Sequence, residues 1–242
     1  QGDFIPARQP SLSGYEDPDN PGSLKQTLAI SGYQYNTAIG AGAQAAGNSS
    51  LAIGTLATSS IKNGGSSVDK AVAIGYSAGV SDDKAIAIGS EAKSNSKSAS
   101  AIGDTALALA ENALAVGTNA QAEGVSSGAI GTRNRVTGTD TYVLGSENST
   151  TATGTGADVS ASNSGIFGNE NSMEGDSNRI VGNKNILKME SLANNSSNPK
   201  VFENIFVTGN QNTVTGDPDT STAGDAGNVS DITVTGSKNT VR

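Results

Sequence analysis

The stretch Leu51-Ala52-Ile53-Gly54 decides how this sequence folds, because close copies of it return along almost the whole chain. The clearest other copies are Thr37-Ala38-Ile39-Gly40, Val72-Ala73-Ile74-Gly75, Ile86-Ala87-Ile88-Gly89, Ser100-Ala101-Ile102-Gly103, Leu114-Ala115-Val116-Gly117 and Gly128-Ala129-Ile130-Gly131, and looser copies end at Gly145, Gly168, Gly182, Gly209 and Gly236. From Gly40 the glycine spacings are 14, 21, 14, 14, 14, 14, 14, 23, 14, 27 and 27 residues. A period of 14 with insertions of 7, 9, 13 and 13 predicts a solenoid with loops between its turns.

Each repeat has room for two short strands and two turns. In the copy from Ser100 to Ala113, we expect one strand to end at Gly103 and a second to run from Ala106 to about Ala110. Glycine then supplies the permissive backbone at the corner. Stacking such coils about 4.8 Å apart predicts an all-β parallel solenoid on the order of 60 Å long.

Small residues define the predicted interior. The position two before the glycine is Ala in the first seven repeats, from Ala38 to Ala129, and the third residue after it is Ala in the first six, from Ala43 to Ala120. Because side chains alternate faces along a strand, these alanines face each other across a narrow core.

The alternation places the residue just before each glycine on the outside, yet that residue is aliphatic. A continuous apolar stripe does not stay in water on a monomer, so it predicts an obligate oligomer. The interface predicted on this basis comprises Ile39, Leu51, Ile53, Val72, Ile74, Ile86, Ile88, Ile102, Leu114, Val116, Ile130 and Leu144.

The pattern changes after Gly131. The third residue after the glycine becomes Asn, at Asn134, Asn148, Asn171, Asn185, Asn212 and Asn239, while the inner positions grow to residues such as Val143 and Ile180. Stacked Asn amides can bond to the coils above and below as a structural ladder. A row of Asn that reads a ligand is the alternative. Outside, Thr208 and Thr235 replace the aliphatic stripe.

Composition argues against most enzyme classes. The chain of 242 residues has no histidine and no cysteine, which removes the commonest general base and all thiolate sites. Its net charge of -8 disfavours a general nucleic-acid or anionic-membrane binder. We therefore expect no enzyme, no catalytic site and no cofactor. No apolar run is long enough for a membrane-spanning helix, and no signal peptide is visible.

Two parts lie outside the regular repeat. Residues 1–35 carry four of the six prolines and are predicted to form an irregular arm whose aromatic residues cover the first coil, with a disordered leader as the alternative for residues 1–20. The repeat domain spans residues 36–242, with insertions near 60–68, 150–160, 188–200 and 216–228. Binding on a regular scaffold usually uses inserted loops. The candidate ligand-binding residues there are Lys62, Asn63, Asp158, Asn194, Asn195, Lys200, Phe202, Asp217 and Asp219, although burial inside the next coil is the expected fate of both Phe202 and Phe206.

A 14-residue repeat of the form Ser-x-Ala-Ile-Gly resembles the YadA-like head of trimeric autotransporter adhesins. Asn48 to Gly54, Ala71 to Gly75 and Ala85 to Gly89 carry the likeness most clearly, and it covers roughly residues 36–242. The resemblance implies a left-handed parallel β-roll, a homotrimer, and display on the Gram-negative cell surface. It also implies adhesion to a host receptor or to a matrix protein such as collagen or fibronectin, through either the loops or the repeat wall. The family's neck, stalk and outer-membrane anchor are not seen here, so an excised head is expected, without direct membrane insertion.

Other functions remain open at this point. A passive spacer in a surface fibre fits the same repeat. Ice binding would need a regular Thr array, at which only Thr213, Thr215, Thr233 and Thr235 hint. Asp217, Asp219 and Asp225 offer carboxylates for calcium, but at an irregular spacing, so no metal site is predicted.

Overall fold

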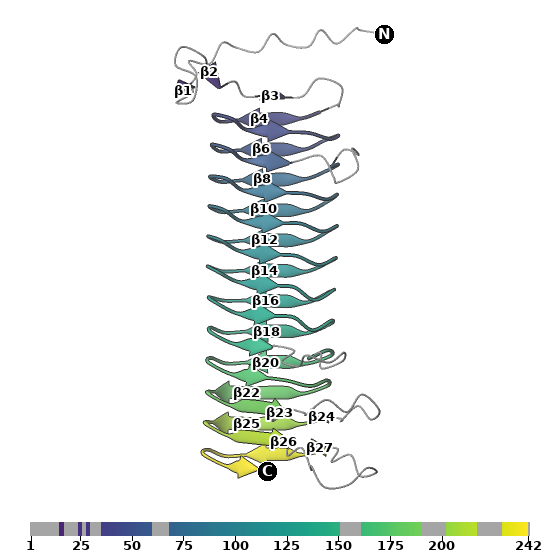
Figure 1. Cartoon of the computed structure of the whole chain (residues 1–242), viewed down its shortest axis with the longest axis vertical. Helices are drawn as coiled ribbons and strands as arrows, with labels where there is room; N and C mark the ends of the chain where they lie inside the picture. Colours follow the sequence, from purple (N-terminus) through teal and green to yellow (C-terminus); the bar gives the residue numbers. More distant parts are fainter. Residues whose placement is uncertain are drawn as a thin grey trace.

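The computed structural model of the chain is a rod made of two facing parallel sheets, with the strands running across its long axis (Figure 1). It describes residues 15–16, 24–25, 28–29, 35–59, 68–150, 161–189, 202–216 and 229–241. All described secondary structure is β, so the predicted all-β solenoid of regular short strands is confirmed. No helix in the described part of the chain is long and apolar enough to cross a membrane.

The first sheet is formed by the strands that precede the repeat glycines. Its twelve strands, in order along the rod, are β4 (Thr37–Ile39), β6 (Leu51–Ile53), β8 (Val72–Ile74), β10 (Ile86–Ile88), β12 (Ser100–Ile102), β14 (Leu114–Val116), β16 (Gly128–Ile130), β18 (Tyr142–Leu144), β20 (Gly165–Phe167), β22 (Arg179–Asn183), β25 (Phe206–Asn210) and β28 (Thr233–Thr235). Equivalent residues pair from coil to coil, as Ala87 does with Ala73 and Ala101. The same pairing holds across insertions, as for Ala52 with Ala73 and Val143 with Ile166, so the insertions do not shift the register.

The second sheet is formed by the strands that follow the glycines. Its thirteen strands are β3 (Leu28–Ala29), β5 (Gln44–Ala45), β7 (Thr58–Ser59), β9 (Gly79–Val80), β11 (Lys93–Ser94), β13 (Leu107–Ala108), β15 (Gln121–Ala122), β17 (Arg135–Val136), β19 (Ser149–Thr150), β21 (Ser172–Met173), β23 (Ile186–Met189), β26 (Thr213–Gly216) and β29 (Thr240–Val241). Two small pairs stand apart from these sheets, β1 (Tyr15–Glu16) with β2 (Leu24–Lys25) and β24 (Phe202–Glu203) with β27 (Val229–Ser230).

Most strands hold two or three residues, fewer than the second strand predicted for the Ser100 repeat, although β22 and β25 hold five and β23 and β26 hold four. Where a strand over Ala106 to Ala110 was expected, β13 holds Leu107–Ala108 alone. The turns account for the difference, because the repeat glycines have φ between 112° and 144° and non-glycine residues beside the turns have φ between 51° and 64°. These left-handed residues also join the ladder, since Glu91 donates its N–H to the Tyr76 carbonyl at 2.8 Å.

The interior is narrow at first and then widens. In the N-terminal half Ala87, Ala101 and Ala115 are fully buried, opposite alanines such as Ala92 and Ala106. The buried positions are filled further along by larger side chains, among them Val143, Ile166, Met173, Ile180, Leu187, Val207 and Val214. This is the change in core size that the sequence predicts.

The N-terminal arm differs from its prediction in two ways. Within residues 1–35, β3 extends the second sheet by pairing Leu28 with Gln44, 16 residues away, a spacing that hides it from a search for the 14-residue period. Tyr35, one of the aromatic residues expected to cover the first coil, is 84% exposed. Tyr35 itself has φ 64° and so belongs to a turn rather than to a cap.

Candidate interaction surface

The outer face of the first sheet carries two rows of side chains, which are called here the upstream and the downstream row. The upstream row lies three residues before each glycine, at Thr37, Leu51, Val72, Ile86, Ser100, Leu114, Gly128, Tyr142, Gly165, Arg179, Phe206 and Thr233. The downstream row lies one residue before it, at Ile39, Ile53, Ile74, Ile88, Ile102, Val116, Ile130, Leu144, Phe167, Val181, Thr208 and Thr235. Together they form the apolar face.

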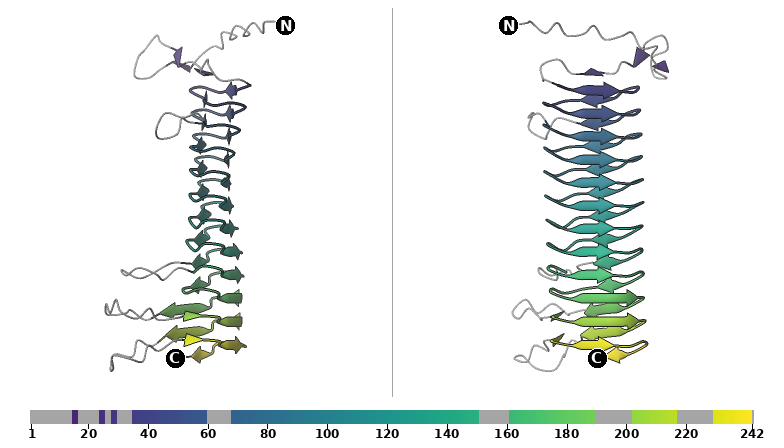
Figure 2. Two further views of the ribbon diagram at one scale, coloured as in Figure 1. Left: turned by 90° about the vertical axis from the view of Figure 1, so that its right-hand side faces the viewer. Right: turned by 180° about the vertical axis from the view of Figure 1, so that it is seen from behind.

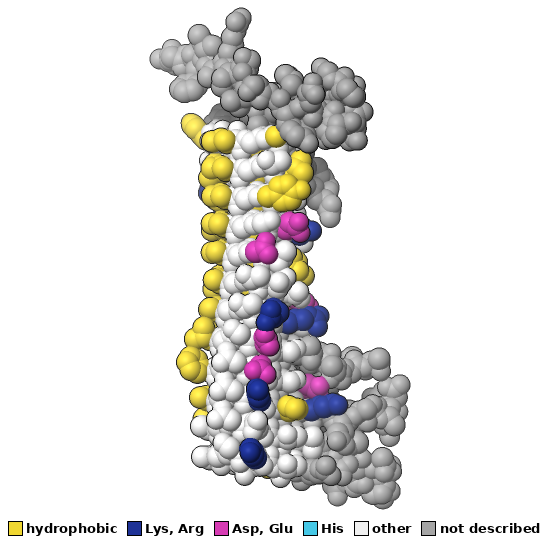
Figure 3. Space-filling view, turned by 90° about the vertical axis from the view of Figure 1, so that its left-hand side faces the viewer, with side chains coloured by type: hydrophobic (Ala, Val, Ile, Leu, Met, Phe, Trp, Pro, Cys, Tyr) yellow, Lys and Arg dark blue, Asp and Glu magenta, His cyan; other side chains and the backbone are white. Residues whose placement is uncertain are grey.

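This face contains all twelve residues predicted as an interface, and the chain itself does not bury them. Ile39 is 53% exposed, Ile102 38% and Leu144 45%, and the remaining nine are half-buried or exposed. In the space-filling view a hydrophobic row runs down the left edge of the rod (Figure 3). The apolar surface extends beyond the prediction, to Tyr142, Phe167, Val181 and Phe206.

The opposite wall, the outer face of the second sheet, is mostly polar. Its outward residues include Gln44, Thr58, Lys93, Gln121 and Arg135. The Arg135 guanidinium binds the Glu123 carboxylate in a bidentate fashion, with Nε–Oε1 at 2.8 Å and Nη2–Oε2 at 2.9 Å. This hydrogen bond and the Glu123 charge raise the pKa of Arg135, against the opposing effect of desolvation. The two walls therefore differ in kind, and the polar one is suited to water.

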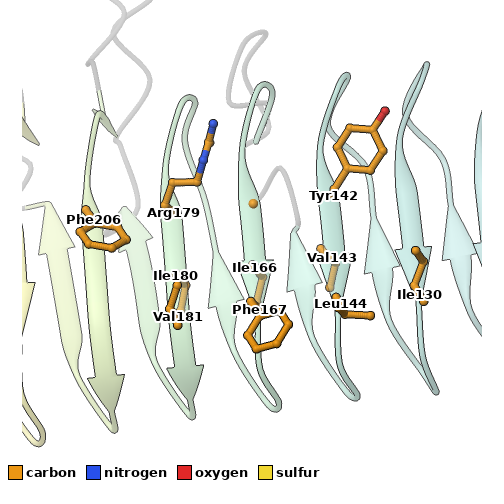
Figure 4. Close-up of a pocket in the computed structure, with 11 residues that line it drawn as sticks. Ile130, Tyr142, Val143, Leu144, Ile166, Phe167, Arg179, Ile180, Val181 and Phe206 are labelled. Atoms are coloured by element: carbon orange, nitrogen blue, oxygen red, sulfur yellow. The ribbon is translucent and has the colours of Figure 1, made fainter.

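A shallow hollow of about 280 Å³ interrupts the apolar face near its C-terminal end. Its outer lining comes from Ile130, Tyr142, Leu144, Gly165, Phe167, Arg179, Val181 and Phe206, on five successive strands from β16 to β25 (Figure 4). The Arg179 guanidinium is fixed at its edge by donating to the backbone carbonyls of Asn163 at 2.6 Å and Asn178 at 3.1 Å. Apart from this one charge, the hollow is an aromatic and aliphatic surface.

The six predicted asparagines form a continuous ladder inside the coils, in which the first five are buried and Asn239 at the end is half-buried. Asn171 donates its backbone N–H and its Nδ2 to Oδ1 of Asn148, at 3.0 and 2.9 Å, and its Nδ2 also reaches the Gly182 carbonyl at 2.8 Å. The same pattern repeats at each rung from Asn134 to Asn239. These amides face the interior and bond to each other. Their arrangement therefore supports a structural role for the asparagines rather than the alternative role in ligand binding.

Sequence reasoning missed a second ladder on the surface. Asn169 donates to Oδ1 of Asn183, and Asn183 donates in turn to Oδ1 of Asn210, each through the backbone N–H and Nδ2. All three residues are exposed. The signal was available, because each of them directly follows a repeat glycine.

The candidate binding loops lie largely outside the described residues. Lys62, Asn63, Asp158, Asn194, Asn195, Lys200, Asp217 and Asp219 belong to that group. Of the predicted loop candidates, Phe202 is described, and it is 3% exposed, so its expected burial is confirmed and it is not available as an aromatic anchor for a ligand. Its ring packs into the C-terminal core, whereas Phe206, for which burial was also expected, is 42% exposed.

No group of acidic residues in the described ranges could hold a metal ion. The carboxylates considered for calcium, Asp217, Asp219 and Asp225, lie outside those ranges. What the described surface offers is contact: a long apolar wall, a polar wall, and one aromatic hollow.

Residues 37–57, 69–92 and 94–120 match the sequence model of one family, described as the YadA head domain repeat in two copies. The matched segments cover the regular Ala-rich coils from β4 to β14. No curated protein matches the chain.

Proposed function

We propose, from the premise that this chain carries YadA head domain repeats, that it is an adhesin head which attaches a Gram-negative bacterium to a host surface as a homotrimer. Heads of this family are trimeric, surface-exposed structural adhesins, typically without enzymatic activity. The homotrimer of this chain, its host ligand and its display on the outer membrane are the parts that we add for this chain.

The exposed apolar face is the observation that supports the proposed homotrimer. The apolar face runs along one wall of the rod and includes aliphatic and aromatic side chains that are 36–60% exposed, such as Ile88 and Phe167. Soluble monomers rarely expose a contiguous apolar surface of this length. Covering the wall with two further copies would bury it and leave the polar second sheet outward.

Adhesion would then depend on repetition. Three copies side by side present every surface site three times, so weak single contacts combine through a high effective concentration. Host cell-surface receptors and extracellular matrix proteins such as collagen or fibronectin are the proposed partners. Two locations on the head compete for the contact, the insertions after the second-sheet strands and the repeat wall itself.

Light scattering on the purified chain eluting from gel filtration tests the assembly. We expect a mass near three times 24.0 kDa. A folded species of 24.0 kDa would refute the homotrimer and the mechanism that depends on it.

Binding to immobilised collagen, fibronectin and host cells tests the adhesion. The trimer should bind with a slower dissociation than a variant held monomeric, and removal of one insertion at a time should identify which, if any, carries the contact. A stable trimer that binds none of these surfaces would favour the alternative, a passive spacer in a surface fibre.

A further inference from the structure

At the C-terminal end of the apolar face, a large side chain in one row stands beside a small one in the other, and the row that holds the large side chain changes between strands. On β20 the upstream residue is Gly165 and the downstream residue is Phe167, the smallest residue beside a large one. On β25 the order is reversed, with Phe206 upstream and Thr208 downstream. Residues two apart on a strand both point outward, side by side, so the packing within one chain does not require a large residue to be paired with a small one here.

Gly165 lies at the floor of the hollow described above, and the hollow is open there because glycine has no side chain. Tyr142 and Phe206 lie in the upstream row on strands on either side of β20, and Phe167 lies on β20 itself in the downstream row (Figure 4). An apolar cavity of about 150 Å³ can hold a benzene ring, so a hollow of about 280 Å³ has room for a phenyl side chain. Phe167 is 60% exposed, so its own chain leaves most of that ring uncovered.

Symmetry relates the hollow to the ring. The strands run across the rod, so the two rows on one strand are displaced sideways by about 6.6 Å. Around a three-fold axis parallel to the rod, each copy has one neighbour on either side, and contacts between neighbours join different patches at the same height. The upstream row of one copy would therefore face the downstream row of the next.

We propose that the hollow over Gly165 of each copy is filled by Phe167 of the next copy, and that Phe206 of each copy packs against Thr208 of the next copy, at a level two coils further along the rod. This inference rests on the homotrimer proposed above and specifies how its copies are aligned along the long axis of the rod. Large residues meet small ones at both levels, which explains the reciprocal sizes. The Arg179 guanidinium, held by two backbone carbonyls, lies at the edge of the hollow, where it can stack on the incoming ring.

The chain has no cysteine, so paired substitutions test the contact directly. Gly165→Cys with Phe167→Cys should give covalent trimers on a non-reducing gel after mild oxidation, because each bond joins adjacent copies and three bonds close a ring. A Cβ at Gly165 would be 3.4 Å from Cδ of Arg179, an ordinary contact, so the substitution is compatible with the fold. Phe206→Cys with Thr208→Cys is a second, independent pair.

The matched control is Gly165→Cys with Thr208→Cys, which uses the same two rows two coils apart, a separation of about 10 Å along the rod. We expect at least tenfold more covalent trimer from each same-height pair than from this control. Non-covalent trimers in which neither pair exceeds the control would overturn the row pairing while leaving the homotrimer standing, with the hollow then open to a host ligand. A monomeric unaltered chain would overturn both.

A size exchange provides a measurement that does not depend on disulfide geometry. Gly165→Phe should expel the neighbour's ring and lower the fraction of trimer at equal total concentration, and Phe167→Ala should lower it by removing that ring. The double variant should recover most of the trimer, because the new ring fills the space that the neighbour vacates. Additive losses in the double variant would contradict the proposal.

Discussion

At the scale of single residues, the repeat glycine is fixed by two separate demands. Gly89 has φ +135°, and a Cβ built on it would lie 2.2 Å from the carbonyl oxygen of Gly103 in the next coil. Backbone atoms on both sides cannot move without opening the ladder. The left-handed corner and the close stacking of coils therefore need the same residue.

Gly89→Ala should lower the free energy of unfolding by about 2–4 kcal/mol, because it combines a strained φ with a backbone clash. Gly79→Ala is the matched control, since its Cβ would meet no atom closer than 3.7 Å and its φ lies outside the left-handed region. Denaturant titration followed by circular dichroism measures both. Equal effects would show that the corner geometry is not what selects glycine.

The two asparagine ladders separate burial from hydrogen bonding. Asn171 and Asn169 sit two residues apart and make similar amide bonds, but Asn171 is buried and Asn169 is exposed. Asn171→Ala should cost about 2–4 kcal/mol, because it leaves the Asn185 N–H, Oδ1 of Asn148 and the Gly182 carbonyl without these partners in the interior. Asn169→Ala should cost about 1 kcal/mol or less, since water replaces its bonds. Chemical denaturation distinguishes them, and comparable losses would contradict this account.

At the scale of strands, the width of the core dictates which substitutions each half tolerates. Ala101 stacks between Ala87 and Ala115 with no accessible surface, so Ala101→Val should destabilise by about 1–3 kcal/mol through overpacking.

In the wider half the opposite change is harmful. Ile180→Ala should cost about 2–5 kcal/mol through the cavity it leaves among Ile166, Val207 and their neighbours. Thermal unfolding compares the two variants with the unaltered chain. Enlargement at Ala101 that stabilises the protein would mean that the N-terminal core is looser than its alanines indicate.

The strands were predictable to the extent that the period of 14 imposed them. The glycine spacing gave the coils, and the alternation of Ala and Ile gave inside and outside, because a strand permits only two faces. The extent of each strand was not predictable, since residues such as Glu91 and Lys84 adopt the left-handed region without any glycine to signal it. Their conformation depends on hydrogen bonds to neighbouring coils, which one repeat does not reveal. The strand at Leu28–Ala29 was also not predicted, because its spacing from the next strand departs from the 14-residue period.

For the whole molecule, the apolar face should control assembly without controlling the fold of each chain. Ile102→Lys places a charge on a face that we propose is buried between copies, yet the side chain points out of its own coil. We expect light scattering to show mostly 24.0 kDa species while circular dichroism keeps its β signal. Gln121→Lys, on the polar wall, is the control and should leave the mass unchanged. A trimer that survives Ile102→Lys would place the contact elsewhere.

The sequence indicated the interface better than the hollow within it. A stripe of Ile and Leu is visible in a list of repeats, whereas the hollow depends on Gly165, Tyr142 and Phe206, which come from three separate coils and break the motif. Phe202 and Phe206 show the limit clearly. They lie four residues apart beside the same insertion, and the sequence did not reveal that one faces the core and the other the surface.

The direction of the hydrogen bonds has a mechanical consequence. Because the strands cross the rod, the bonds between coils run along it, as from Gly89 N to the Ile74 carbonyl, and a load applied to the two ends pulls on them lengthwise (Figure 2). Between Gly40 and Gly117 the backbone carries nearly all of that load, whereas from Asn134 onward each step also has three hydrogen bonds from the asparagine ladder. Under tension the N-terminal coils with the alanine core should unfold first, while the C-terminal coils joined by the asparagine ladder stay folded.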